Sequence, residues 1–200
     1  FQTAEKVQVP VDIKVPGRLA FNAERSKVLA ARAPGRVERI YAFDGAQVNV
    51  GSPIVELYSP DFISAQQEYL LSSKIARVLV ANKSMNDLLE DARFTQDAAA
   101  NRMRNLGASD ADIKIIETTG RTQTNLTMRA PLKGVVVKRN VEPGAAVAAG
   151  DVMATLADPK HLWFLGNVFE QDFRMVKPGQ KIILRLEAYP DKEFVAYANY

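Results

Sequence analysis

The feature that most constrains the fold is a short unit that the chain contains twice. The stretch GAQVNVGSPIVELYSPD (residues 45–61) aligns without a gap to GAAVAAGDVMATLADPK (residues 144–160), 99 residues further along the chain. The identical pairs at this spacing include Gly45 and Gly144, Gly51 and Gly150, Pro60 and Pro159, and, upstream, Gly35 and Gly134. We expect the first six of these residues to be structural or hinge positions, because glycine and proline set the geometry of turns and boundaries.

The turn signals in each copy are only five or six residues apart, so the predicted strands are very short. Strands of that length cannot bury an apolar face alone and need a partner sheet. The most economical partner for each copy is the other copy. The repeat therefore predicts one β-sandwich built from two halves rather than two tandem domains.

The sequence between the copies has a helical pattern. The run FISAQQEYLLSSKIARVLVAN contains no glycine or proline, and LLEDARFTQDAAANRMRNL follows after a short polar break. Each run places apolar and small residues three and four apart, which predicts two helices of about 20 residues, each about 30 Å long. Ser59 is expected to cap the first helix and Pro60 to begin it. An antiparallel hairpin of this kind returns the chain to the sandwich that it left.

Shorter elements are predicted on both sides of the sandwich. Ser109 and Asp112 form a capping-box pattern that opens a short helix ending at Gly120. Residues 5–32 alternate apolar and polar side chains, which predicts a strand-rich segment. Near the other end, residues 169–176 are predicted as a short helix, and Tyr189-Pro190-Asp191 as a turn between two strands.

Composition excludes several kinds of site. The chain has no cysteine and a single histidine, His161, so thiolate metal sites, disulfides and sites with several histidines cannot form from these residues alone. The net charge is only +3 and no basic cluster with interleaved aromatics occurs, so we expect no nucleic-acid partner. No nucleophile or acid lies at a readable spacing from a base, and we predict that the protein is not an enzyme.

Two longer stretches carry a family resemblance. APGRVERIYAFDGAQVNVGSPIVELYSPDFISAQQEYL (residues 33–70) and APLKGVVVKRNVEPGAAVAAGDVMATLADPKHLWF (residues 130–164) resemble the periplasmic adaptor proteins, or membrane fusion proteins, of heavy-metal RND efflux systems. Arg36 departs from the pattern, because the family often has an aromatic residue after the glycine. The resemblance covers nearly the whole chain.

The resemblance implies an elongated, multi-domain α+β fold. It has a split lipoyl-like β-sandwich with an inserted antiparallel α-helical hairpin, plus a β-barrel domain. The implied barrel comprises residues 1–30 and 160–200, with a membrane-proximal domain expected beyond Tyr200. The implied lipoyl-like domain comprises residues 31–60 and 121–159, and the implied hairpin residues 61–120.

The resemblance also implies the function. Such adaptors connect a proton-driven RND transporter of the inner membrane to an outer-membrane channel and associate with copies of themselves in a ring. We therefore expect a periplasmic protein, associated with or anchored to the inner membrane in its full-length form. Its expected cargo is a heavy-metal cation. The expected contact with the channel is the hairpin tip, formed by Asn82, Lys83, Ser84, Met85 and Asn86.

Metal binding by the adaptor itself is a separate expectation. No cofactor is expected, but transported Zn, Cu, Ag, Co or Cd ions could bind transiently at His161, with Glu170 as a second ligand. Two other functions stay open: an adaptor for drug efflux or type I secretion, and a biotinyl or lipoyl carrier. A carrier needs a modified lysine at the tight turn between its halves. Here the helical insertion replaces that turn, and its lysines are Lys74, Lys83 and Lys114.

Overall fold

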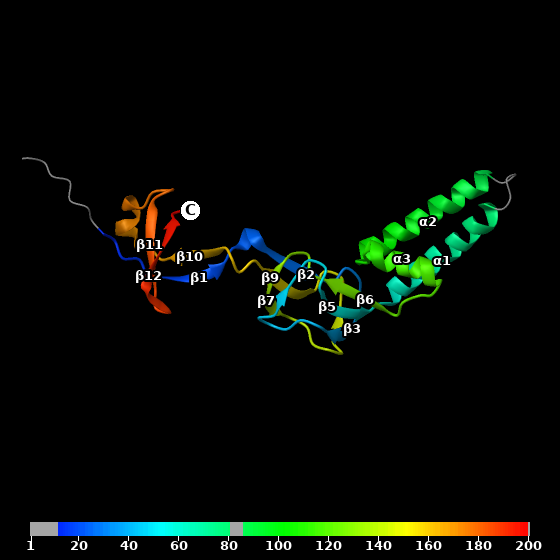
Figure 1. The fold of residues 1–200 in the computed structure, drawn as a ribbon, viewed down its shortest axis with the longest axis horizontal. Helices are drawn as coiled ribbons and strands as arrows, with labels where there is room; N and C mark the ends of the chain where they lie inside the picture. Colours follow the sequence, from blue (N-terminus) through cyan, green and yellow to red (C-terminus); the bar gives the residue numbers. More distant parts are fainter. Residues whose placement is uncertain (1–11, 81–85, 200) are drawn as a thin grey trace, which may run out of the picture. The chain divides into compact units, whose positions relative to one another are not determined.

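The computed structural model describes residues 12–80 and 86–199 (Figure 1). The chain divides into two compact units. The larger unit is Phe21–Leu162, and the smaller one combines Phe1–Ala20 with Trp163–Tyr200. The boundaries predicted for the lipoyl-like, hairpin and barrel domains stay predictions. None of the helices in the described ranges has the length and hydropathy required to cross a bilayer.

The larger unit contains two four-stranded antiparallel sheets. Their strands are β2 (Ser26–Ala30), β3 (Gly35–Ile40), β4 (Gln47–Val48), β5 (Pro53–Tyr58), β6 (Asn125–Arg129), β7 (Gly134–Arg139), β8 (Ala146–Val147) and β9 (Val152–Ala157). The strand orders are β2-β9-β7-β4 and β6-β5-β3-β8. Every strand of the second half begins and ends 99 residues after its equivalent in the first half. The first copy of the structural repeat therefore begins at Ser26 and the second at Asn125, so each copy is longer than the sequence alone revealed.

The two halves interlock through equivalent hydrogen bonds. The Val37 N–H donates to the Ala145 carbonyl (2.9 Å), and the equivalent Val136 N–H donates to the Ala46 carbonyl (3.0 Å). Each short strand, β4 or β8, pairs with a long strand of the other half. Neither half could satisfy its main-chain groups alone. The prediction of one sandwich built from two copies is confirmed.

The helices of the insertion are α1 (Pro60–Val80), α2 (Asn86–Leu106) and α3 (Asp110–Thr119). They follow β5 and precede β6, as Figure 1 shows by colour. Both parts of the predicted capping box are present: the Asp112 N–H donates to Ser109 Oγ, and the Ser109 N–H donates to the Asp112 carboxylate. Gly120 ends α3 with φ of +63°, a left-handed conformation that favours glycine.

The core joins the sandwich to the base of the insertion. Its largest completely buried side chains come from the strands (Ile54, Leu57, Leu126, Met153 and Leu156) and from the helices (Phe62, Met103 and Ile116). These side chains belong to one continuous apolar cluster. The insertion is therefore packed onto the sandwich by its first and last turns, and is not attached only by the chain.

The predicted capping role of Ser59 is wrong. α1 begins at Pro60, as expected, but Ser59 Oγ is completely buried and accepts no hydrogen bond within the described residues. Ser59 directly follows β5 and shares the burial of the sandwich core. Proline at the first helical position already fits the helix start, because its missing N–H would have had no partner inside the helix.

The smaller unit is less regular. β1 (Gly17–Phe21) pairs with β10 (Leu162–Gly166), and β11 (Lys181–Leu186) pairs with β12 (Tyr189–Tyr197); the 3-10 helix η2 (Glu170–Met175) lies between β10 and β11 in the chain, and another, η1 (Ala23–Arg25), follows β1. In the described residues this unit has two-stranded sheets and no closed barrel. Residues 12–16 are not part of a strand, contrary to the alternating pattern.

The turn between β11 and β12 also differs from the prediction. It lies at Glu187 and Ala188, whereas Tyr189 already pairs with Leu186 in the sheet. The ladder shifts register between Arg185 and Leu186. The irregularity accommodates Pro190, which cannot donate a ladder hydrogen bond, near the start of a strand.

Candidate functional site

The predicted partner-contact residues lie between α1 and α2. Asn82, Lys83, Ser84 and Met85 fall outside the described residues, and Asn86 is the first residue of α2. The helix ends next to them carry exposed apolar side chains: Val78, Val80 and Leu88 are 63%, 57% and 53% exposed. Val78 and Val80 lie on different faces of α1, because they are two residues apart, so these side chains are exposed singly around the helix ends. The apolar spacing that predicts the two helices does not identify these side chains as exposed.

An exposed apolar surface lies on the second half of α1. Leu71, Ile75 and Val78 are four and three residues apart, so they lie on one face of the helix, and all three are exposed. The buried residues of α1, such as Ala65, Tyr69 and Ala76, form the other face. We name Leu71, Ile75 and Val78 the outer stripe of α1.

His161, the predicted metal ligand, lies in a small charged cluster. Its Nδ1 atom is 2.8 Å from Asp158 Oδ2 and 3.2 Å from Arg25 Nη1, and the Arg25 guanidinium is 3.6 Å from the same carboxylate oxygen. The Lys160 N–H donates to Asp158 Oδ1, and this bond, followed by His161, lowers the pKa of the Asp158 carboxyl. The cluster connects the segment that leaves the sandwich after β9 to η1, the helix before β2.

The second predicted ligand, Glu170, belongs to η2 in the smaller unit, whereas His161 belongs to the larger one. Within residues 12–80 and 86–199, no group of three or more histidine, aspartate and glutamate side chains is placed to hold a metal ion. His161 and Asp158 therefore provide a two-residue pair at most among the described groups. Metal binding by His161 or Glu170 stays a proposal.

The predicted glycine positions form turns. Gly45, Gly51, Gly144 and Gly150 have φ values of +83°, +83°, +86° and +97°, a region that other residues rarely adopt. A Cβ atom at any of the four would meet no atom within 4 Å. Glycine is therefore required there by the backbone conformation, and not by a lack of space for a side chain. Pro60 begins α1, and Pro159 follows the residue that contacts His161.

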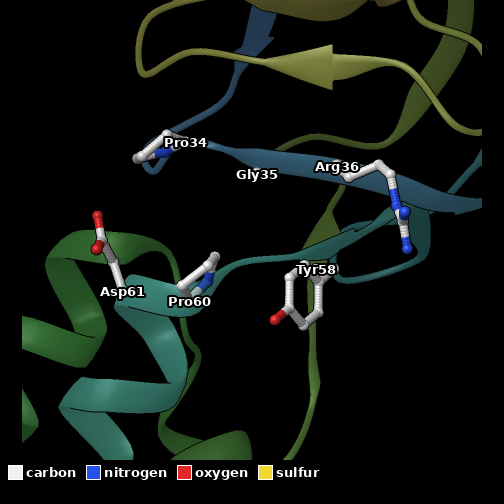
Figure 2. Close-up of a pocket in the computed structure, with 6 residues that line it drawn as sticks. All are labelled: Pro34, Gly35, Arg36, Tyr58, Pro60 and Asp61. Atoms are coloured by element: carbon white, nitrogen blue, oxygen red, sulfur yellow. The ribbon is translucent and has the colours of Figure 1, made fainter.

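An open pocket of about 590 Å³ lies where β3, β5 and α1 meet. Figure 2 shows its lining residues, which are Pro34, Gly35, Arg36, Tyr58, Pro60 and Asp61. The Arg36 guanidinium is already paired with the Glu38 carboxylate at 2.7 Å and 2.9 Å. The prolines and the tyrosine provide an apolar wall, and the lining includes no serine, cysteine, lysine or histidine. The pocket is better suited to contact than to chemistry.

The described lysines of the insertion do not occupy a carrier position. Among those in the described residues, Lys74 lies in α1 and Lys114 lies in α3. A carrier lysine must project from a tight turn between two strands so that its arm can swing. Neither residue meets that requirement.

The base of the hairpin is held by polar contacts that the sequence did not suggest. Gln66 of α1 is completely buried and hydrogen-bonds to the main chain of Gln123, just before β6. On the surface, Arg102 of α2 forms a two-oxygen ion pair with Glu68 of α1 at 2.7 Å and 2.8 Å. The first contact joins the hairpin to the sandwich, and the second joins the two helices.

Comparison with known proteins gives the family. The sequence model described as "CusB, barrel-sandwich hybrid domain" matches residues 26–157, which are the residues from the start of β2 to the end of β9. The chain is 28% identical over 178 residues to the cation efflux system protein CusB of Escherichia coli (strain K12), and 25% identical over 181 residues to the putative membrane fusion protein SilB of Salmonella typhimurium. These alignments cover 88% and 90% of the chain, but only 40% and 39% of the relatives.

A solved structure shares the fold. The crystal structure of ZneB from Cupriavidus metallidurans superposes with a TM-score of 0.61 at 21% identity, over 93% of this chain and 82% of that one. The residues matched by the family model contain both interlocked halves and the helical insertion. The chain therefore belongs to the CusB family of membrane fusion proteins, and residues 26–157 are its barrel-sandwich hybrid domain.

Proposed function

We propose that the protein is the periplasmic adaptor of an efflux system, without enzymatic activity, that connects an inner-membrane RND transporter to an outer-membrane channel and serves the export of heavy-metal cations. The observation that supports this most is the insertion of two 21-residue helices between two interlocked halves of a sandwich. Helices of this length extend a contact site about 30 Å beyond the sandwich. CusB, the relative named above, is a cation efflux system protein.

The adaptor is also proposed to associate with copies of itself, as its family resemblance implies. The outer stripe of α1 supports this, because Leu71, Ile75 and Val78 expose apolar surface away from α2. Burial of that surface against a neighbouring copy would stabilise the assembly. In the full-length protein, association with the inner membrane is part of the same proposal.

The hairpin tip is the proposed contact with the channel. In the full-length protein, Lys83→Glu combined with Met85→Glu is expected to reduce channel capture in a pull-down at least tenfold, because the first change reverses a charge and the second places a new charge at an apolar residue. Capture of the RND transporter should not change. Lys114→Glu, the same substitution as at Lys83 but at an exposed residue of α3, is the control. If the double variant captures as much channel as the control does, the tip assignment is wrong.

His161 and Glu170 are each proposed to contact transported metal transiently. Neutral imidazole binds Zn and Cu ions, and Asp158 at 2.8 Å can orient the ring. Isothermal titration with Zn²⁺ and Cu⁺ is expected to give heat that His161→Ala removes and Lys160→Ala keeps. Identical curves for the wild type and His161→Ala would eliminate this site.

A further inference from the structure

The joint between hairpin and sandwich contains a polar contact with an unusual arrangement. Gln66 lies in the second turn of α1 and is completely buried, although glutamine is mostly exposed in proteins. A buried amide is costly unless its donors and acceptor are satisfied. The hydrogen-bond partners of Gln66 therefore indicate its role in the fold.

The partners are main-chain groups. Gln66 Oε1 accepts a hydrogen bond from the Gln123 N–H (2.6 Å), and Nε2 donates to the Gln123 carbonyl (2.8 Å) and to the Phe62 carbonyl (3.1 Å). The amide thus pairs with both main-chain groups of one residue, as a neighbouring strand would. Only this orientation of the amide works, since the reverse would direct its oxygen at two carbonyl oxygens.

The contact between Gln66 and Gln123 links two segments whose strands, β5 and β6, also pair with each other. β5 leads through Ser59 directly into α1, and Tyr58 of β5 pairs with Asn125 at the start of β6. Gln123 lies two residues before that strand. Because Gln66 holds Gln123, the start of α1 is fixed twice to the pair of strands β5 and β6, once by the chain and once by the amide.

Two other polar links among the described residues join the insertion to the sandwich over longer distances; the first is an ion pair and the second a hydrogen bond. Arg129 of β6 is 3.4 Å from Asp112 of α3, and Arg32 reaches the Arg104 carbonyl of α2 at 3.5 Å. Both distances are at the limit of hydrogen bonding. Phe62 contributes apolar packing, which has no directional preference. The short and buried bonds that give direction come from Gln66.

We infer that Gln66 is the positioning residue of the hairpin: its amide fixes the direction of α1 relative to the sandwich by pairing with the main chain of Gln123. The inference deepens the proposed function, because an adaptor that contacts a distant channel needs a defined hairpin direction. The structural claim itself can be tested without any pump or channel.

The chain has no cysteine, so spin labels can be placed without removing native residues. One labelled pair, Arg93→Cys on α2 and Lys138→Cys on β7, measures the distance between hairpin and sandwich by pulsed EPR. A second pair, Lys74→Cys and Asp97→Cys, measures the hairpin alone. All four side chains belong to exposed residues of the larger unit. The full chain is used throughout.

Gln66→Met keeps the side-chain length but removes all three hydrogen bonds. It is expected to broaden the Arg93–Lys138 distance distribution at least twofold and to leave the Lys74–Asp97 distribution unchanged. Gln66→Glu keeps the acceptor for the Gln123 N–H but directs its second oxygen at two carbonyl oxygens, so it should also broaden the Arg93–Lys138 distribution. Gln67→Met, at an exposed neighbour, and Gln123→Ala, which keeps the main chain, should both behave as the wild type.

Two results would overturn the inference. One is an Arg93–Lys138 distribution in Gln66→Met that is as narrow as in Gln67→Met. The other is equal broadening of the Lys74–Asp97 pair, which would make Gln66 a general stabiliser of the helices. If Gln66→Met does not fold, Gln66→Glu is compared with Gln67→Glu by the same two criteria. Failure of metal export in cells would count against the proposed function and leave these distances unaffected.

Discussion

Phe62→Ala is expected to lower the free energy of unfolding of the larger unit by about 3–5 kcal/mol, the usual cost of removing a buried phenylalanine. Phe62 is in the first turn of α1 and is completely buried in the cluster that the strands and helices share. The substitution would leave a cavity between the sandwich and the hairpin. Urea denaturation followed by circular dichroism measures the change.

Phe94→Ala is the matched control, because Phe94 lies on α2 and is 78% exposed. The control should change the free energy of unfolding by less than about 0.5 kcal/mol. A Phe62→Ala variant as stable as the control would show that the helices do not share a core with the sandwich.

Gly134→Ala is expected to destabilise the sandwich by about 3 kcal/mol, at the upper end of overpacking effects. A Cβ atom at this position would lie 2.2 Å from the Ala157 carbonyl oxygen and 2.8 Å from Leu132 Cδ1. The equivalent Cβ at Gly35 would lie 2.2 Å from the Tyr58 carbonyl oxygen. Because the clash is with main chain in both halves, Gly35→Ala should cost a similar amount.

Gly144→Ala separates this effect from backbone strain. Gly144 has φ of +86°, but a Cβ there would meet nothing within 4 Å, so only strain of about 1–2 kcal/mol is expected. Thermal denaturation of the three variants gives the comparison. If Gly134→Ala proves no less stable than Gly144→Ala, the close approach of β7 to β9 is incorrect.

The two halves could be predicted from the sequence because their equivalent turns use the same residue types. Glycines with positive φ, such as Gly45 and Gly144, have few substitutes, so identity survives there. β2 and β6 occupy equivalent positions in the two halves, but Ser26–Ala30 and Asn125–Arg129 have no identical residue at any equivalent position. A strand needs only a suitable alternation of burial, which many residues provide, and the full extent of the repeat is visible only in the hydrogen-bond pattern.

The polar contacts at the joints were less predictable. Ser59 followed a good capping pattern, yet tertiary burial overrode it. Gln66 lies between exposed Ser64 and Gln67, and its partner Gln123 is 57 residues away, so no local pattern identifies it. Arg25 is 136 residues from His161 and was missed for the same reason. Contacts between distant segments depend on the fold, not on local spacing.

The chain continues differently after each half of the repeat. After Tyr58 the chain enters α1, and after Ala157, the equivalent residue, it forms the Asp158, Arg25 and His161 cluster and leaves for the smaller unit. The proposed channel contact follows the first half.

The most direct test of the proposed function is the metal tolerance of a strain that lacks the encoding gene. Export of heavy-metal cations predicts that the tolerated concentration of at least one of Zn, Cu, Ag, Co or Cd falls several-fold. It also predicts that tolerance of organic drugs does not change, and that a plasmid copy of the full-length gene restores growth on metal. Unchanged tolerance of all five metals, or a loss confined to drugs, would contradict the account.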